Sequence, residues 1–171
     1  MDDSRRLRQI LQGLPNPKIL VVGDLILDRY ADGKTGRVSP EAPVLVFELD
    51  SERYLLGGAC NVAANLHNLG AETSVLGVIG DDEAGRTLRQ LLSDDGIDTG
   101  VLVTDRTRPT TRKTRYVAKT AQVLRVDEES KAPIAVHHRQ LVFDLSHLEL
   151  NQLKPHLPPK LDSLKLFTFS G

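Results

Sequence analysis

A pair of glycines ahead of a helix is the clearest sign of a ligand site in this sequence. The stretch from Gly57 to Gly80 reads GGACNVAANLHNLGAETSVLGVIG. Paired glycines at a helix start let a ligand approach the backbone closely, and they leave unpaired N–H groups facing it. Asn61 falls at the start of the same helix, and its amide both donates and accepts hydrogen bonds. Taken alone, Asn61 would be assigned a bond to its own backbone, but after Gly57 and Gly58 it suits a site for a polyol.

A single carboxylate is the second candidate. Asp28 stands at the end of an extended segment, five residues after Gly23. A carboxylate that accepts hydrogen bonds from sugar hydroxyls orients the sugar and discriminates strongly between ligands. The alternative is an aspartate that pairs with Arg29 or caps a turn, and the residue types alone favour neither interpretation.

Two cations alternate along a predicted strand. Lys113 and Arg115 are two residues apart, so both side chains leave the same face of that strand. They could clamp a phosphate on a sugar, with Arg115 binding in bidentate fashion. The alternative is a solvated strand face, since this whole stretch of the chain is basic. Weaker candidates for the same role are Arg37 and Arg125.

The acidic cluster and the cysteine predict no catalytic residue and no metal ligand. Asp81, Asp82 and Glu83 precede a predicted helix, and helix capping explains all three acids better than a metal site does. Cys60 is the one cysteine of the chain. It has no visible activating neighbour, so we expect a buried small hydrophobe rather than a nucleophile.

Alternating strand and helix patterns predict an α/β fold that carries a β flap. Helices are expected at 1–17, after the glycine pair, after Asp82 and over much of 130–153. The polar segment 31–36 is expected as a turn within the flap, whose strands lie within about 24–56 and 101–127. The expected strands cover 18–23, 44–49, 73–79, 97–103, 113–117, 123–126 and 163–169.

Bulk composition narrows the class of protein. The chain has 171 residues, enough for one domain with a real core. Its net charge of -1 argues against a dedicated nucleic-acid or membrane-surface protein. No apolar run is long enough to span a bilayer, and the N-terminal residues lack the features of a secretory signal. One cysteine excludes an internal disulfide, so we expect a cytoplasmic protein.

The motifs together resemble those of the ribokinase-like (PfkB) sugar kinases. Residues in register with the first signature of that family are Gly57, Gly58, Ala59, Asn61, Ala63, Gly70 and Gly80. The segments VVGDLILDRY at 21–30 and RVSPEAP at 37–43 are similar to the opening of bacterial D-glycero-β-D-manno-heptose 7-phosphate kinases. Those kinases often form the first half of a bifunctional heptose kinase and adenylyltransferase. The resemblance runs from about Ile19 to about Asp127.

The resemblance implies a partial ribokinase-like, three-layer α/β fold and a sugar kinase of the heptose 7-phosphate type. In the complete enzyme, the γ-phosphate of ATP would pass with Mg²⁺ to the anomeric hydroxyl, a step in ADP-heptose synthesis for lipopolysaccharide. The implied sugar ligands are Asp28, Gly57, Gly58 and Asn61, with Lys113 and Arg115 for the 7-phosphate.

A second family signature is missing from these residues. In the family, Gly-Ala-Gly-Asp supplies the general base and the amides that stabilise the transferred phosphate. The 171 residues contain neither this motif nor a P-loop or G-x-G-x-x-G. We therefore expect one incomplete kinase domain over 1–171, without the nucleotide-binding half, that binds no ATP tightly and is inactive alone. The alternative is a non-catalytic module that binds a sugar phosphate or forms a homodimer through its β flap.

Overall fold

The computed structural model of the chain describes residues 16–134 and, as backbone, residues 164–169. Two helices lie among nine strands in the described residues, and parallel strands β1 and β4 are joined through α2, so the predicted α/β class is confirmed. The elements are β1 (Lys18–Gly23), β2 (Leu25–Val38), β3 (Leu45–Gly58), α2 (Ala59–Asn68), β4 (Glu72–Leu76), β5 (Val78–Gly80), α3 (Glu83–Asp94), β6 (Val103–Asp105), β7 (Thr111–Ala118), β8 (Ala121–Glu128) and β9 (Leu164–Phe169). The helices expected at 1–17 and 130–153 fall almost entirely outside the described residues.

A parallel three-stranded sheet, in the order β4-β1-β9, contributes residues of β1 and β4 to the hydrophobic core. Strand β1 matches the predicted 18–23, and its residues Ile19 to Val22 are all buried, as a strand covered on both faces requires. Helix α2 connects β3 to β4 and buries Ala59, Cys60 and Ala63 in the core. The final predicted strand is also present, as β9 beside β1.

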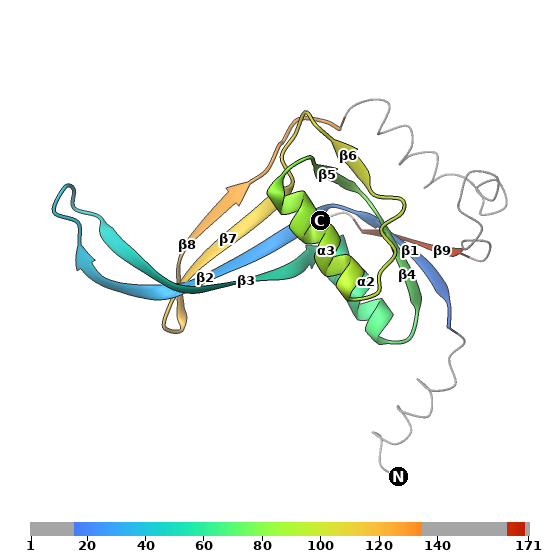
Figure 1. The fold of residues 1–171 in the computed structure, drawn as a ribbon, viewed down its shortest axis with the longest axis horizontal. Coiled ribbons are helices and arrows are strands. Elements are labelled where there is room, and N and C mark those ends of the chain that lie inside the picture. Colours follow the sequence, from blue (N-terminus) through green and yellow to red (C-terminus); the bar gives the residue numbers. More distant parts are fainter. Residues whose placement is uncertain (1–15, 135–163, 170–171) are drawn as a thin grey trace, which may run out of the picture.

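A second sheet, in the order β3-β2-β7-β8, extends away from helices α2 and α3 (Figure 1). We call it the flap. The turn predicted at 31–36 is wrong, because those residues belong to β2, which pairs with β3 up to Val38. The chain reverses over 39–44 instead, where the N–H of Ser39 donates to the carbonyl of Val44 at 2.8 Å. Ala31 and Gly33 of this segment are buried and the other four residues are half-buried or exposed, so the polar residues occupy positions of a strand and not of a turn.

Two other predicted strands need correction. The strand expected at 73–79 is two strands, since the chain leaves β4 at Gly77 and β5 pairs with β6 in a separate sheet. Of the strand expected at 97–103, only Val103 is extended in a strand. Asp98 makes an isolated bridge to Ser74, and the carbonyl of Thr99 then accepts a turn bond from Leu102 at 3.2 Å.

The start of α3 is tied to the start of β7, which helps to place the flap. Asp82 caps α3 as predicted, accepting a hydrogen bond from the Gly85 N–H at 2.8 Å. It also accepts from the N–H of Thr110 at 2.9 Å and from its hydroxyl at 2.7 Å. The hydroxyl of Thr110 in turn accepts from the Gly80 N–H at 2.8 Å. Residue Thr110 directly precedes β7, so these hydrogen bonds fix where that strand begins.

Candidate functional site

Strand alternation in β2 brings Asp28 to one side of the flap. Leu27 is completely buried, so the side chains on either side of it in sequence leave the opposite face. That face carries Asp28 and Tyr30 from β2, and in register with them Lys113 and Arg115 from β7. We call this side of the flap the site face. The sheet pairing therefore gathers the predicted carboxylate and both predicted cations on one surface.

Gly57, the first residue of the glycine pair, lies directly beside the carboxylate of Asp28. A Cβ placed on Gly57 would be 2.7 Å from Oδ2 of Asp28, so the backbone of β3 passes immediately beside this side chain. Gly58 has φ +54°, and a Cβ there would run into the carbonyl oxygen of Asp24. That carbonyl accepts the N–H of Ala59 at 2.9 Å, which begins α2. Gly57 thus lets β3 pass beside Asp28, and Gly58 lets the chain turn from β3 into α2.

Asn61 lies in the first turn of α2 with its side chain exposed. Its Oδ1 accepts a hydrogen bond from the side chain of Asn65 at 3.3 Å, and its backbone carbonyl accepts from the same amide at 2.9 Å. The N-cap of this helix is Gly58, which provides no side-chain cap. The N–H of Ala59 already donates to Asp24, so of the first-turn N–H groups only those after Ala59 could donate to a ligand.

Arg115 and Asp28 form an ion pair across 87 residues of sequence. Nη1 of Arg115 donates to Oδ1 of Asp28 at 2.5 Å, and the side chains are only 20% and 19% exposed. The hydrogen bond to Asp28 raises the pKa of Arg115, against the lowering effect of burial. Lys113 is half-buried and sits opposite Asp28 on one side and Asp127 on the other. Within residues 16–134, its side chain makes no ion pair.

The two weaker cation candidates, Arg125 and Arg37, lie in different parts of the flap. Arg125 of β8 is opposite Arg115, so it lies on the site face, where its Nε contacts Asp127 at 2.9 Å. Arg37 lies near the far end of the β2–β3 hairpin and pairs with Glu48 at 3.2 Å. The structure brings Arg125 near the other cations and leaves Arg37 at the tip of the flap.

Sequence reasoning missed two residues of the site face. The ring of Tyr30 lies between two guanidinium groups, with Cζ of Arg53 4.3 Å and Cζ of Arg115 5.3 Å from its centroid. The period of two that starts at Asp28 could have identified Tyr30. No sequence pattern predicts Arg53 on this face, because its position opposite Tyr30 depends on the register of the β2–β3 hairpin.

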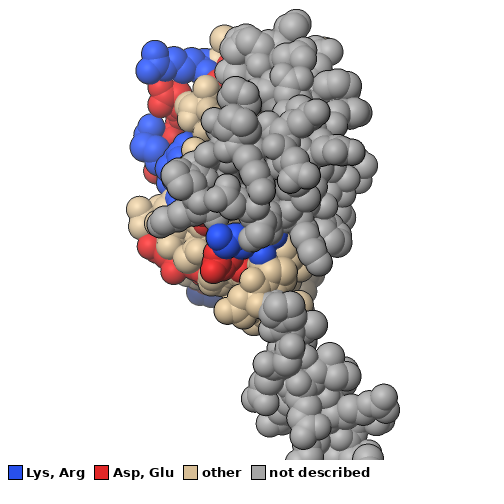
Figure 2. Space-filling view, turned by 90° about the vertical axis from the view of Figure 1, so that its right-hand side faces the viewer, with Lys and Arg blue, Asp and Glu red and all other residues tan. Residues whose placement is uncertain are grey.

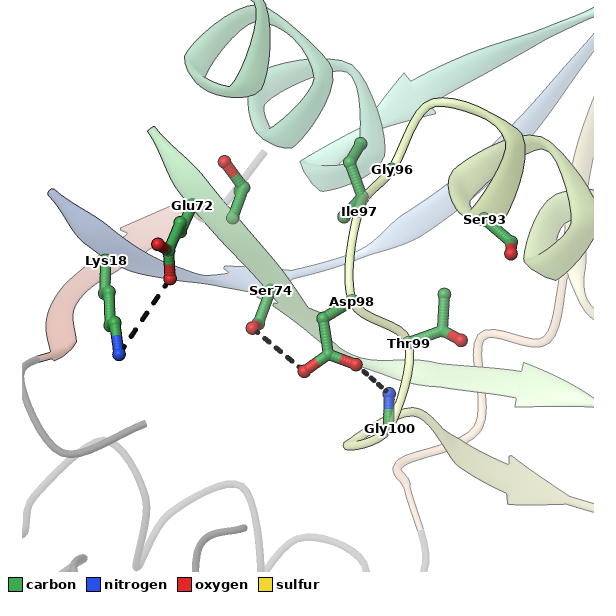
Figure 3. A pocket seen from close by; sticks show the side chains of 10 residues that line it. Lys18, Glu72, Ser74, Ser93, Gly96, Ile97, Asp98, Thr99 and Gly100 are labelled. Atoms are coloured by element: carbon green, nitrogen blue, oxygen red, sulfur yellow. Dashed lines mark hydrogen bonds and ion pairs between the residues drawn. The ribbon is translucent and has the colours of Figure 1, made fainter. Parts of the chain in front are cut away.

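A separate cavity of about 600 Å³ lies at the amino ends of β1 and β4 (Figure 3). Its polar groups largely engage one another: Lys18 and Glu72 approach to 3.9 Å, and Ser74 donates to Asp98 at 3.3 Å. No predicted site residue lines it. Ligands of open α/β sheets bind at the carboxyl ends of the strands. A smaller cavity of about 130 Å³ occupies that position, beside Asp24.

Charges of both signs are mixed on the surface. On the side shown in Figure 2, the visible Lys and Arg side chains lie beside Asp and Glu side chains. Neither α2 nor α3, the helices of the described residues, has the length and apolar character needed to cross a membrane.

A model of the pfkB family of carbohydrate kinases matches residues 16–164, a range that includes every residue of the candidate site. The chain belongs to the pfkB carbohydrate kinase family. The resemblance expected from the glycine signature is thereby confirmed. Among curated relatives, Bifunctional protein HldE of Helicobacter hepaticus is 48% identical over 138 residues. That alignment covers 81% of this chain and 29% of the relative, so the chain spans less than a third of its length.

Solved structures of a ribokinase and of a carbohydrate kinase share the fold. Ribokinase of Arabidopsis thaliana, complexed with ribose and ATP, matches with a TM-score of 0.54 at 21% identity, over 66% of this chain and 36% of that one. A carbohydrate kinase from Agrobacterium tumefaciens matches with a TM-score of 0.53 at 21% identity, over 81% and 39% of the two chains. These neighbours confirm the predicted ribokinase-like fold class.

Proposed function

We propose that this chain is the sugar-binding part of a kinase of the heptose 7-phosphate type. The observation that carries the proposal is the position of Asp28, held by Arg115 on one side and lying directly beside Gly57 on the other. Membership of the pfkB family and the similarity to Bifunctional protein HldE support a carbohydrate substrate.

The proposed site has a hydroxyl-binding end and a cationic end. Oδ2 of Asp28 lies over Gly57 and accepts no hydrogen bond from residues 16–134, so it can accept one from a sugar hydroxyl. Asn61 and the backbone at Gly58 supply further polar groups to the same ligand. Lys113 and Arg115 form the cationic end, which gives the site a reason to prefer a phosphorylated sugar.

In this proposal, ATP and Mg²⁺ bind only to the complete enzyme. Among residues 16–134 there is no group of three His, Cys, Asp or Glu side chains that could hold a metal ion, and the 171 residues lack the family's Gly-Ala-Gly-Asp motif. In the complete enzyme, the bound nucleotide supplies the phosphoryl group. The residues of the site face and the start of α2 bind and orient the acceptor sugar. We place the reaction in the cytoplasm, where a single buried cysteine stays reduced.

A ligand panel tests the proposal. The purified chain is titrated by calorimetry with heptose 7-phosphate, the unphosphorylated heptose, inorganic phosphate and ATP. We expect saturable binding of the two sugars, tighter for the phosphorylated one. Binding of ATP alone, with no response to either sugar, would overturn the assignment.

The same chain should have no kinase activity. Loss of a general base alone costs about two to four orders of magnitude in rate. With ATP, Mg²⁺ and heptose 7-phosphate present, we expect no ADP release above background. Turnover at roughly 1 s⁻¹ or more would show that these residues hold a complete catalytic apparatus.

Exposed apolar side chains on the flap favour an additional role in self-association. Val38 and Leu45, which face each other near the hairpin end, are 60% and 66% exposed. We propose that two copies pair through the flap and cover these residues. Light scattering should then show a dimer that Leu45→Ser converts to monomer. Leu69→Ser, at a comparably exposed leucine after α2, is the matched control and should leave the dimer intact. A monomeric wild-type chain would exclude this role.

A further inference from the structure

The cations of the site face differ in how they are neutralised. Three of them are arginines that each contact their own carboxylate: Arg115 with Asp28, Arg125 with Asp127, and Arg53 with Asp32. Lys113 is the exception. It lies in register between Asp28 and Asp127, and both of those acids are already engaged by arginines. Among residues 16–134, Lys113 has no ion-pair partner of its own.

Burial and two contacts hold the Arg115 side chain in place. It is about four-fifths buried, it donates to Oδ1 of Asp28 at 2.5 Å, and it lies over the ring of Tyr30. Moving Arg115 to a ligand phosphate would break a charge-assisted hydrogen bond and leave Asp28 partly buried without its partner, which is costly. The arrangement instead fixes Asp28 through one oxygen and leaves the other, Oδ2, turned toward Gly57.

On these grounds we infer that the two cations of the proposed site have different functions. Arg115 is a positioning residue that orients Asp28 toward the sugar hydroxyls. Lys113 is the residue that recognises the phosphate and so sets the preference for a phosphorylated sugar. This inference rests on the proposed function, because it needs a sugar phosphate as the ligand.

Lys113 suits a phosphate for a simple reason of charge. Each of the three arginines of the site face pairs with a carboxylate. Of these four cations, Lys113 alone can therefore bind an anionic ligand without losing an ion pair. An ammonium on a flexible stem can reach a phosphate without any carboxylate losing its partner. Its position directly opposite Asp28 places that charge one strand away from the group that binds hydroxyls.

The test compares two ligands across matched variants by calorimetry. Lys113→Gln should weaken binding of heptose 7-phosphate by roughly tenfold or more, the usual effect of losing one charge-assisted bond, and leave binding of unphosphorylated heptose unchanged. Arg115→Gln should weaken binding of both sugars by the same factor. Arg115→Lys should restore part of that loss for both, because a cation again meets Asp28.

A double-mutant comparison identifies the group through which Arg115 acts. In an Asp28→Asn background, Arg115→Gln should change affinity for either sugar by less than about threefold, since the carboxylate that it orients is gone. Urea unfolding of every variant shows whether it is folded. If Arg115→Gln does not fold, Arg115→Lys replaces it in the titrations.

The outcomes separate the inference from the proposed function. If Arg115→Gln or Arg115→Lys loses only the preference for the phosphorylated sugar, then Arg115 itself binds phosphate and the inference is wrong. If Lys113→Gln retains the wild-type preference, the inference is also wrong, while the proposed function stands. A wild-type chain that binds neither sugar overturns the proposed function and this assignment with it.

Discussion

The carboxylate of Asp28 occupies the space in which a side chain at residue 57 would begin. A Cβ built on Gly57 lies 2.7 Å from Oδ2 and 3.0 Å from Cγ of Asp28, and 3.2 Å from Cβ of Ile26. These distances are shorter than ordinary van der Waals contacts. On its other side, Asp28 is held by Arg115, so it cannot simply turn away. The absence of a side chain at Gly57 is therefore what allows the carboxylate to lie against the end of β3, two residues before α2 begins.

The first prediction follows from this contact. Gly57→Ala should displace Asp28 or push β3 away from β2, lowering the free energy of unfolding by about 1–3 kcal/mol, as overpacking does. Gly36→Ala, in the same hairpin, is the matched control because nothing lies within 4 Å of the added Cβ. Urea unfolding measures both. Equal midpoints for the two variants would show that the contact imposes no constraint.

A second prediction concerns pH and the cap of α3. Burial raises the pKa of Asp82, but the hydrogen bonds from Thr110 and from the Gly85 N–H outweigh burial and hold it below its ordinary value of 3.8. A carboxylate whose pKa is lowered by folding stabilises the protein above its unfolded pKa. That contribution is lost as the pH falls through the folded pKa.

We therefore expect Asp82→Asn to be less stable than wild type near neutral pH, with the difference shrinking as the pH drops below 3.8. Urea unfolding at a series of pH values measures this. Asp81→Asn removes the same charge from the adjacent residue and leaves the cap in place, so it controls for net charge. A stability difference that grows on acidification would contradict a lowered pKa for Asp82 in the folded chain.

The third prediction concerns Cys60. The residue is completely buried in α2, and burial raises the pKa of its thiol to about 12. The thiolate is the reactive form, so the native chain should react very slowly with a disulfide reagent at about pH 8. The same chain in urea should react at the rate of a free thiol. Fast reaction of the folded chain would mean that the start of α2 opens readily.

The sequence predicted the local parts of the site and missed its long-range contacts. Gly57 was predicted from the glycine pair before a helix, and Asp28 from the resemblance to the kinase family, since its residue type alone favoured neither interpretation. The bond between Arg115 and Asp28 joins residues 87 apart and depends on the parallel pairing of β2 with β7, which no local spacing encodes. Lys113 and Arg115 therefore looked equivalent in the sequence, although the fold gives them different partners.

The misplaced turn has a similar cause. Segment 31–36 contains two glycines and polar residues, which are typical of a turn, but its buried positions are the small residues Ala31 and Gly33, so the strand shows no pattern of large apolar residues. The actual reversal follows Val38, at the prolines of 39–44. With the turn misplaced, the register of β3 against β2 could not be predicted, and Arg53 was missed.

The central claim is that Asp28 binds the hydroxyls of a sugar phosphate, and calorimetric titration of Asp28→Asn with heptose 7-phosphate tests it most directly. Asp50→Asn removes an equal charge from an exposed residue of β3 that pairs with Lys34, and it serves as the control. We predict that Asp28→Asn weakens binding by roughly tenfold or more, as expected when one acceptor oxygen becomes a donor, whereas Asp50→Asn binds as wild type does. Equal affinity of wild type and Asp28→Asn would contradict the claim.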